Sequence, residues 1–362
     1  MGKWFKSCSM VLSVFFFSMF LTSMALAKPL ILNYSSGYGE NFSLSMHDRW
    51  WAQELEKRSG GKVKIEFYWS QGLVKIPESL EAASSGITDI SFFATGYFGG
   101  QLPLSTSSQL FYLTEKPDAM SRAMMDVYNA FPAFRDEYEK KNNVKVLTFS
   151  GCTPNIVGVR KPWKGLKDFE GKKIRVFPGW EEAVSKLGGT PVTISWGEIY
   201  TSLENGVIDA YTGTMWDLAG IGKFYEQAPY ILDLKQGSCA MAVTVINLDS
   251  WNKLPDDVKK IMEEVTQESI GKQAELYMEA DARIYNVYKN ADVKTLEFSP
   301  EDVNKFRDLI VPKRWDNWKK DMESKGQPGV EFFDKLTSAI KKHEPQSTYL
   351  SPFVRYPDLK LD

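Results

Sequence analysis

The amino-acid sequence predicts an α/β protein built from two lobes. Short apolar strands alternate with amphipathic helices along most of the chain, a pattern typical of open sheets flanked by helices. The chain has 362 residues, a length that suggests two domains, each able to bury its own core. The segment from Leu254 to Ala291 has no proline after Pro255 and predicts one helix about 50 Å long. Because such a helix is longer than one small domain is wide, we expect it to bridge both lobes.

The first 27 residues have the composition of a secretory signal peptide. Lys3 and Lys6 precede an apolar run, and the run ends at Ala25-Leu26-Ala27. A charged start, an apolar core and small residues at the end are the features of an export signal, so we expect cleavage after Ala27. A membrane anchor is the alternative for this stretch, but its interspersed serines and threonines favour cleavage. The sequence therefore predicts an exported protein.

The charge, cysteine and histidine content narrows the class of function. A formal net charge of −2, or −4 once the two signal lysines are removed, provides no basic surface for nucleic acid or an anionic membrane. Cys8 leaves with the signal, whereas Cys152 and Cys239 would form a disulfide or stay as two buried thiols, which we favour. His47 and His343 have no neighbouring nucleophile or metal partner, so we expect them at the surface. Because catalytic, phosphate-binding and metal-ligand motifs are missing from the sequence, we expect a binding protein rather than an enzyme, with no cofactor and no metal.

The first lobe is expected to contain residues 28–152 and 241–280. Its strands are short apolar or alternating runs, and its helices carry apolar residues at helical spacing. The first helix is expected to stop at a pair of glycines, Gly60 and Gly61, as helices often do. In chain order we expect strands near 29–34, 63–69, 87–95 and 144–149, with helices near 44–59, 76–86 and 119–141.

The second lobe is expected to contain residues 153–240 and 281–345, the latter including C-terminal helices, followed by a tail at 346–362. A run of strand–helix units characterises its first part, and ligand sites of such sheets lie at the carboxyl ends of the strands. We expect strands near 155–161, 172–177, 190–195 and 207–212, with helices near 180–189 and 197–206.

Arg175 is the most unusual residue of these units. It lies between Ile174 and Val176 in a strand that should be buried, and a Pro-Gly turn follows. Its guanidinium presents a rigid fork of donors that matches a carboxylate. The alternative is a structural salt bridge with an acid such as Glu170, which composition alone would favour.

Large aromatic residues also gather at the strand–helix junctions of this lobe. Core packing usually explains a tryptophan. Four such residues at one edge of a sheet weaken that explanation, because junctions often line the cleft. The four residues are Trp180, Trp196, Tyr211 and Trp216.

The segment 166–210 resembles the signature segment of the dicarboxylate-type solute-binding proteins of tripartite ATP-independent periplasmic (TRAP) transporters. Further matches occur at 59–73, 85–93 and 245–262, so the resemblance covers nearly all of the mature chain. The matching residues of the signature are Leu166, Gly171, Lys173, Ile174, Arg175, Val176, Leu187, Gly188, Glu198, Tyr200, Leu203, Gly206 and Asp209.

This resemblance implies a two-lobe periplasmic binding protein fold, with a ligand cleft between the lobes and a long helix bridging both. It implies a periplasmic protein that closes around an organic acid and delivers it to membrane-embedded permease subunits, and we expect a monomer. Arg175 falls on the carboxylate-binding arginine of the family. An extracytoplasmic sensor domain could share this fold and is the alternative from another class.

Two departures from the family bear on the ligand. Gly213 stands where the family often has a ligand-contacting Asn, and Thr153 stands where many members carry a second arginine. Together with the tryptophans, these changes favour an apolar or aromatic monocarboxylate over a C4-dicarboxylate or another hydroxy or keto acid. Asn155, Tyr97 and the tyrosine beside Gly37, Tyr38, complete the expected ligand-binding residues.

Overall fold

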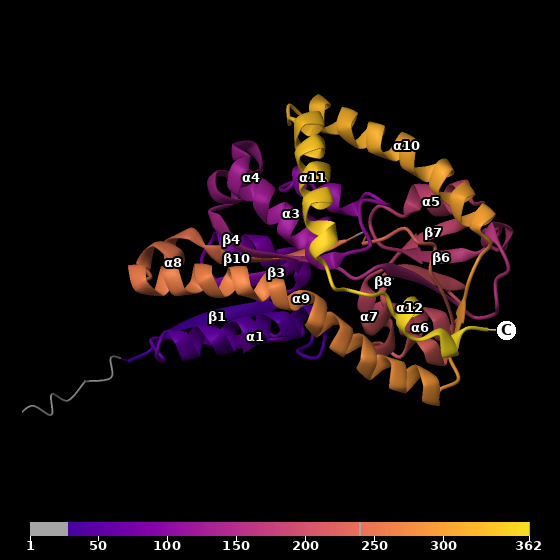
Figure 1. Cartoon of the computed structure of the whole chain (residues 1–362), viewed down its shortest axis with the longest axis horizontal. Helices are drawn as coiled ribbons and strands as arrows, with labels where there is room; N and C mark the ends of the chain where they lie inside the picture. The colour runs from indigo at the N-terminus through magenta and orange to yellow at the C-terminus, as the bar shows by residue number, and fades with distance from the viewer. Residues whose placement is uncertain (1–27, 239, 362) are drawn as a thin grey trace, which may run out of the picture.

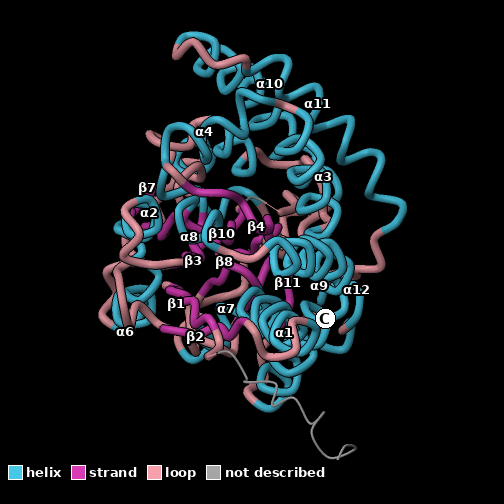
Figure 2. The backbone as a smooth tube through the Cα atoms, turned by 90° about the vertical axis from the view of Figure 1, so that its left-hand side faces the viewer, coloured by secondary structure: helices cyan, strands magenta, loops and turns pink. Residues whose placement is uncertain are grey.

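A computed structural model describes residues 28–238 and 240–361, and the predicted export signal, Cys8 and Cys239 lie outside them. The described chain forms two sheets, each covered by helices (Figure 1). The strands of both sheets lie inside a shell of helices, with helices α1 and α9 side by side (Figure 2). The predicted α/β class with two lobes is therefore confirmed.

The first sheet is five-stranded, in the order β2-β1-β3-β10-β4. β1 runs parallel to β2 and β3, and β10 returns antiparallel between β3 and β4. The central strand β3 is buried along its whole length, which explains its continuous apolar run. The strands are β1 (Leu30–Ser36), β2 (Val63–Tyr68), β3 (Ile90–Ala94), β4 (Val144–Gly151) and β10 (Met241–Asn247).

Helices α1 (Ser43–Arg58), α2 (Ser79–Ser84), α3 (Pro117–Ala130), α4 (Pro132–Asn142) and α8 (Leu248–Lys253) accompany this sheet. The helix expected at 119–141 is two helices, because Pro132 begins a new one and lacks the N–H that would continue α3. After α1, Gly60 and Gly61 adopt left-handed backbone angles, as the expected helix end requires.

The second sheet is six-stranded, in the order β11-β9-β5-β8-β6-β7. β6 runs parallel to β7 and β8, whereas β5 is antiparallel to β8 and β9. Its strands are β5 (Asn155–Val159), β6 (Lys173–Val176), β7 (Thr190–Thr193), β8 (Ala210–Met215), β9 (Tyr230–Leu232) and β11 (Lys294–Leu296). The short helices α5 (Glu181–Lys186), α6 (Ile199–Glu204) and α7 (Trp216–Ile221) follow its strands.

The long helix α9 (Asp256–Asn290) confirms the predicted bridge. It has 35 residues, which corresponds to about 50 Å at helical rise. Its N-terminal part packs against α1, α3 and β4 of the first lobe, and its C-terminal part packs against α7 of the second (Figure 1).

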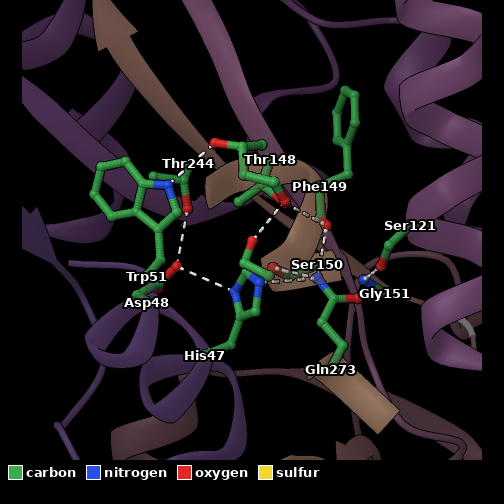
Figure 3. A network of polar contacts seen from close by, with 12 residues as sticks. His47, Asp48, Trp51, Ser121, Thr148, Phe149, Ser150, Gly151, Thr244 and Gln273 are labelled. Atoms are coloured by element: carbon green, nitrogen blue, oxygen red, sulfur yellow. Dashed lines mark hydrogen bonds and ion pairs between the residues drawn. The ribbon is translucent and has the colours of Figure 1, made fainter. Parts of the chain in front are cut away.

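A buried polar network fixes α1 and α9 to the first sheet (Figure 3). Gln273 of α9 donates from Nε2 to the carbonyl of Phe149 at 3.0 Å. His47 and Asp48 of α1 lie beside it, and Asp48 accepts from the Thr244 hydroxyl at 3.2 Å. The expected surface position of His47 is wrong, because its ring is fully buried where α1 meets α9.

The C-terminal helices α10 (Pro300–Ser324) and α11 (Gly329–His343) lead back toward the first lobe. α11 packs on α3, and its Phe332 lies 4.9 Å from Phe134 of α4 between ring centroids. The sequence expectation placed α11 with the second lobe, because its apolar stripe does not specify the surface that it covers. His343 is also nearly buried, contrary to expectation, and lies 2.9 Å from Asp126 of α3.

The two connections between the sheets run side by side. Cys152, just after β4, donates its backbone N–H to the carbonyl of Ala240 at 3.2 Å. Asn155 at the start of β5 donates likewise to Gly237 at 3.2 Å. These paired crossings, together with α9, set the position of one lobe against the other.

Candidate functional site

A pocket lies between the two lobes at the carboxyl ends of the parallel strands, where the βα pattern predicted a ligand site. It has a cavity volume of about 50 Å³ and combines one charged side chain with mostly apolar walls. Its lining residues are Tyr38, Leu44, Ala94, Tyr97, Cys152, Asn155, Arg175, Phe177, Trp196, Gly213, Thr214, Met215, Leu218, Ala240 and Ala242.

Arg175 is only 2% exposed and extends from β6 along the neighbouring strand β8. Its Nε donates to the carbonyl of Ile194 at 3.3 Å. Its Nη1 donates to the carbonyls of Thr212 at 3.1 Å and Gly213 at 3.4 Å. These bonds hold the guanidinium in one orientation through backbone acceptors alone.

The guanidinium has no acidic partner in the described part of the chain. None of the ion pairs found there includes Arg175, so the alternative of a salt bridge with Glu170 is wrong. Its hydrogen bonds within the described residues use Nε and Nη1, which leaves both N–H groups of Nη2 for another acceptor. A buried cation without a carboxylate is costly, so the arrangement is suited to an anion that arrives from outside.

Two tyrosines flank this charge from the first lobe. Burial lowers the pKa of Arg175, and Tyr97 and Tyr38 partly oppose that shift. Burial also raises the pKa of both tyrosines, more than the nearby guanidinium lowers it, so their hydroxyls stay neutral. Neutral hydroxyls beside the guanidinium add donors for an anion without competing for its charge.

Aromatic rings of the two lobes meet across the pocket. Trp196, in the short 3₁₀ turn Trp196–Glu198 after β7, lies 5.5 Å from Phe42, which directly precedes α1. Tyr97 lies 5.7 Å from Phe177 at the end of β6. Both pairs are edge-to-face, a favoured aromatic geometry. They close the sides of the pocket over the guanidinium.

Three of these residues also face a wider outer pocket. Tyr38, Tyr97 and Trp196 line both cavities, and the outer one has a volume of about 440 Å³. Gly37 lines only the outer pocket, beside the loop that follows β2. The three rings therefore separate an outer vestibule from the inner pocket.

The other three predicted aromatics pack in the core instead. Trp180 lies 4.6 Å from Phe111 and also contacts Phe306 of α10. Trp216 lies 4.7 Å from Tyr288 of α9 and also meets the C-terminal tail. The ring of Tyr211 packs on the ring of Phe224 at 5.2 Å. The structure thus brings only Trp196 of the four to the pocket, because a strand–helix junction has a core face as well as a cleft face.

Helix α5 does not offer its N-terminus to the pocket. The helix has only six residues, and two of them are acids in its first turn. Glu181 accepts the Gly179 backbone N–H at 2.7 Å. That carboxylate satisfies the turn before α5, so this helix adds no favourable potential for an anion beside Arg175.

Of three further positions predicted to bind the ligand, only two line the pocket. Gly213 and Asn155 line the pocket, whereas Thr153 is buried outside its lining. Sequence reasoning missed Phe177, although it is two residues after Arg175, a spacing that brings strand side chains to one face. Cys152 is a buried free thiol that lines the pocket, and burial raises its pKa to about 12.

Comparison with known proteins gives one consistent answer. The model of a family described as bacterial extracellular solute-binding protein, family 7, matches residues 45–321. The chain is 25% identical to the sialic acid-binding periplasmic protein SiaP of Vibrio cholerae over 265 residues, which cover 72% of this chain and 80% of that protein.

Solved structures share the architecture. A TRAP solute binding protein from Rhodoferax ferrireducens in complex with copurified benzoate has a TM-score of 0.78, with 22% identity over 88% of this chain and 99% of that one. A TRAP periplasmic solute binding protein from Chromohalobacter salexigens with bound D-glucuronate has a TM-score of 0.73, with 21% identity over 86% of this chain and 99% of that one. At these identities the likeness shows the two-lobe fold alone.

Proposed function

This chain belongs to family 7 of the bacterial extracellular solute-binding proteins, the TRAP solute-binding proteins, and on that basis we propose that it captures an organic acid outside the cytoplasm. It hands the acid to the membrane-embedded permease subunits of its transporter. Within the described residues, no helix is long and apolar enough to span a bilayer. The export signal at the N-terminus, with cleavage after Ala27, and a periplasmic location belong to the same proposal.

The observation that carries the proposal is the unpaired buried guanidinium of Arg175. It is fixed by three backbone carbonyls while Nη2 stays open to the pocket. A carboxylate would complete the fork with charge-assisted hydrogen bonds, which are stronger than neutral ones. Arg175 is therefore the proposed clamp for the carboxylate of the ligand.

The walls support an apolar or aromatic monocarboxylate. Phe177, Met215 and Leu218 contribute apolar surface around the one charged group, and Trp196 and Tyr97 add rings. A second carboxylate would lose its hydration without finding another cation among the lining residues, which is costly. The benzoate found with the Rhodoferax protein is consistent with this class, whereas the sugar acid of the Chromohalobacter protein needs polar groups that this pocket largely lacks.

The pocket is suited to binding rather than to chemistry. Its only nucleophilic sulfur among the described lining residues is Cys152, whose raised pKa keeps it as an unreactive thiol at neutral pH. No cluster of three or more His, Cys, Asp or Glu that could hold a metal occurs in residues 28–238 and 240–361. We infer a binding component without enzymatic activity.

A thermal-shift panel tests the ligand class. Benzoate and branched monocarboxylates should raise the melting temperature of the purified mature protein more than succinate, malate or sialic acid do. Mass spectrometry of acids released on denaturation provides an independent identification of the ligand. A panel in which C4-dicarboxylates stabilise best and aromatic acids do nothing would favour the alternative ligand class of dicarboxylates or other hydroxy and keto acids.

A further inference from the structure

The pocket has a second polar position besides Arg175, at Asn155. This side chain lines the pocket and is only 1% exposed. Its Oδ1 has no hydrogen-bond partner in the described structure. Leaving a buried polar atom unpaired costs free energy, so such an atom in a pocket wall indicates a contact that a ligand completes.

The backbone holds Asn155 firmly in place. Its N–H donates to the carbonyl of Gly237, and its own carbonyl accepts from the Gln236 side chain. In the sheet it pairs with Met215 of β8. Its side chain is therefore presented from a fixed strand end rather than from a mobile loop, which a selective contact requires.

A second unpaired polar group, a hydroxyl, lies on the neighbouring strand β8. Thr214 also lines the pocket, is 4% exposed and has an Oγ1 without a hydrogen-bond partner. It pairs with Ile156, the residue after Asn155, across the β5–β8 ladder. Because neighbouring residues of a strand alternate between its two faces, the Thr214 side chain lies on the face opposite that of Asn155 and Met215 and does not join Asn155 as a partner for the same ligand group.

The two polar positions of the pocket, Arg175 and Asn155, meet β8 at different residues. The guanidinium of Arg175 donates to the carbonyl of Gly213, whereas Asn155 is opposite Met215. Two residues along a strand correspond to roughly 7 Å. This separation is about the span of a benzene ring with substituents at opposite ends.

We propose that Asn155 is a specificity-determining residue, which selects acids that carry a hydroxyl at the end opposite the carboxylate. The proposal rests on the function proposed above, because it requires the carboxylate to be held by Arg175. An amide offers both an acceptor and a donor, so a ligand hydroxyl pairs with either orientation of the Asn155 side chain.

Binding of three matched acids tests this assignment by calorimetry on the mature protein. The probes are benzoate, 4-hydroxybenzoate and 4-methylbenzoate, of which the last fills the same space without a hydroxyl. The wild-type protein should bind 4-hydroxybenzoate on the order of tenfold more tightly than 4-methylbenzoate, since one buried polar group is paired only by the former. The Asn155→Leu variant should lose this preference, so that its dissociation constants for 4-hydroxybenzoate and 4-methylbenzoate become similar.

Thr153→Val is the matched control, because Thr153 is a buried polar residue of the same segment outside the pocket lining. It should preserve the preference. If Asn155→Leu does not fold, the ratio of the two dissociation constants of the wild-type protein still decides. Equal binding of the two para-substituted acids by wild type, or an unchanged preference in Asn155→Leu, would overturn the role of Asn155. Failure of all three acids to bind would instead overturn the proposed aromatic-acid function itself.

Discussion

Replacing Arg175 by methionine should abolish acid binding while leaving the protein folded. Methionine approximates the length of the aliphatic part of arginine and removes only the charged fork. The structure gives a reason to expect this separation, because the guanidinium is buried without a carboxylate partner among the described residues. Under the proposed function, we therefore expect Arg175 to contribute to ligand binding rather than to the fold.

The loss in binding can be estimated from the buried pair. Removing one partner of a desolvated, hydrogen-bonded charge pair costs on the order of 3–5 kcal/mol. That loss corresponds to a weakening of the dissociation constant by roughly two to four orders of magnitude. Arg175→Lys should recover only part of the affinity, since a point charge cannot reproduce two parallel N–H groups.

The change in folding stability should be small. Arg175 makes three hydrogen bonds to carbonyls, at 3.1, 3.3 and 3.4 Å. Losing them costs about 1 kcal/mol each, whereas removing a buried unpaired charge recovers a desolvation penalty of several kcal/mol. The two effects oppose each other, so the free energy of unfolding of the ligand-free protein should change by no more than about 2 kcal/mol in either direction.

Calorimetry with benzoate and urea denaturation without ligand measure the two quantities separately. Arg58→Met is the control, because Arg58 is a surface residue paired with Glu268 at 2.6 Å, away from the pocket. It should leave the dissociation constant unchanged. If Arg175→Met binds benzoate as tightly as wild type, or unfolds with a loss of 3–5 kcal/mol as a broken structural ion pair would, the clamp assignment is refuted.

Three further changes have definite expected outcomes. Burial raises the pKa of Glu137 to about 8, so between pH 4.5 and 8 the folded chain holds a proton that the unfolded chain has released. The free energy of unfolding should therefore fall as the pH rises between these values, by at most about 1.4 kcal/mol per pH unit. Glu137→Gln should flatten this pH dependence in urea melts. Gly213 has φ +69° and an added Cβ would lie 2.3 Å from the Cβ of Phe177, so Gly213→Ala should destabilise the protein and weaken binding, whereas Gly206→Ala, with the same φ and open space, should show backbone strain only. Trp196→Ala should weaken benzoate binding on the order of tenfold by calorimetry, because it removes a pocket wall and an inter-lobe ring contact; unchanged affinity would show that this ring is dispensable.

Local patterns in the sequence predicted the features that depend on a single segment. The absence of proline between Pro255 and Ala291 predicted α9, because a long helix requires only that no residue within the segment interrupts it. Arg175 was identifiable because a charge between Ile174 and Val176 conflicts with a buried strand. The absence of a suitable acid beside it was not predictable, since Glu170 is near in sequence and its position in space depends on the fold.

Features that depend on packing between distant segments were not predictable. Trp180 and Trp216 occur at junctions that looked like cleft positions, but α10 and the C-terminal tail cover them. The neighbours of His47 within α1 are those of a surface residue. The residue is nevertheless buried by α9, which lies more than 200 residues later in the chain. In each case the hydrophobic pattern of the covering segment shows that it has an apolar face, but the pattern does not show which surface that face covers.

The first turn of α1 connects the inner pocket with the contact between the lobes. Phe42, just before this helix, contacts Trp196 of the second lobe, and Leu44 lines the inner pocket. Between them, the backbone N–H of Ser43 donates to the buried Asp217 carboxylate of α7 at 2.9 Å, so the second lobe caps a helix of the first. Separating the lobes by a hinge motion breaks this cap and the ring contact together. Because an acid on Arg175 of the second lobe would also contact Tyr38 and Tyr97 of the first, ligand should bias the lobes toward closure, and solution scattering should show a smaller radius of gyration with saturating benzoate than without it.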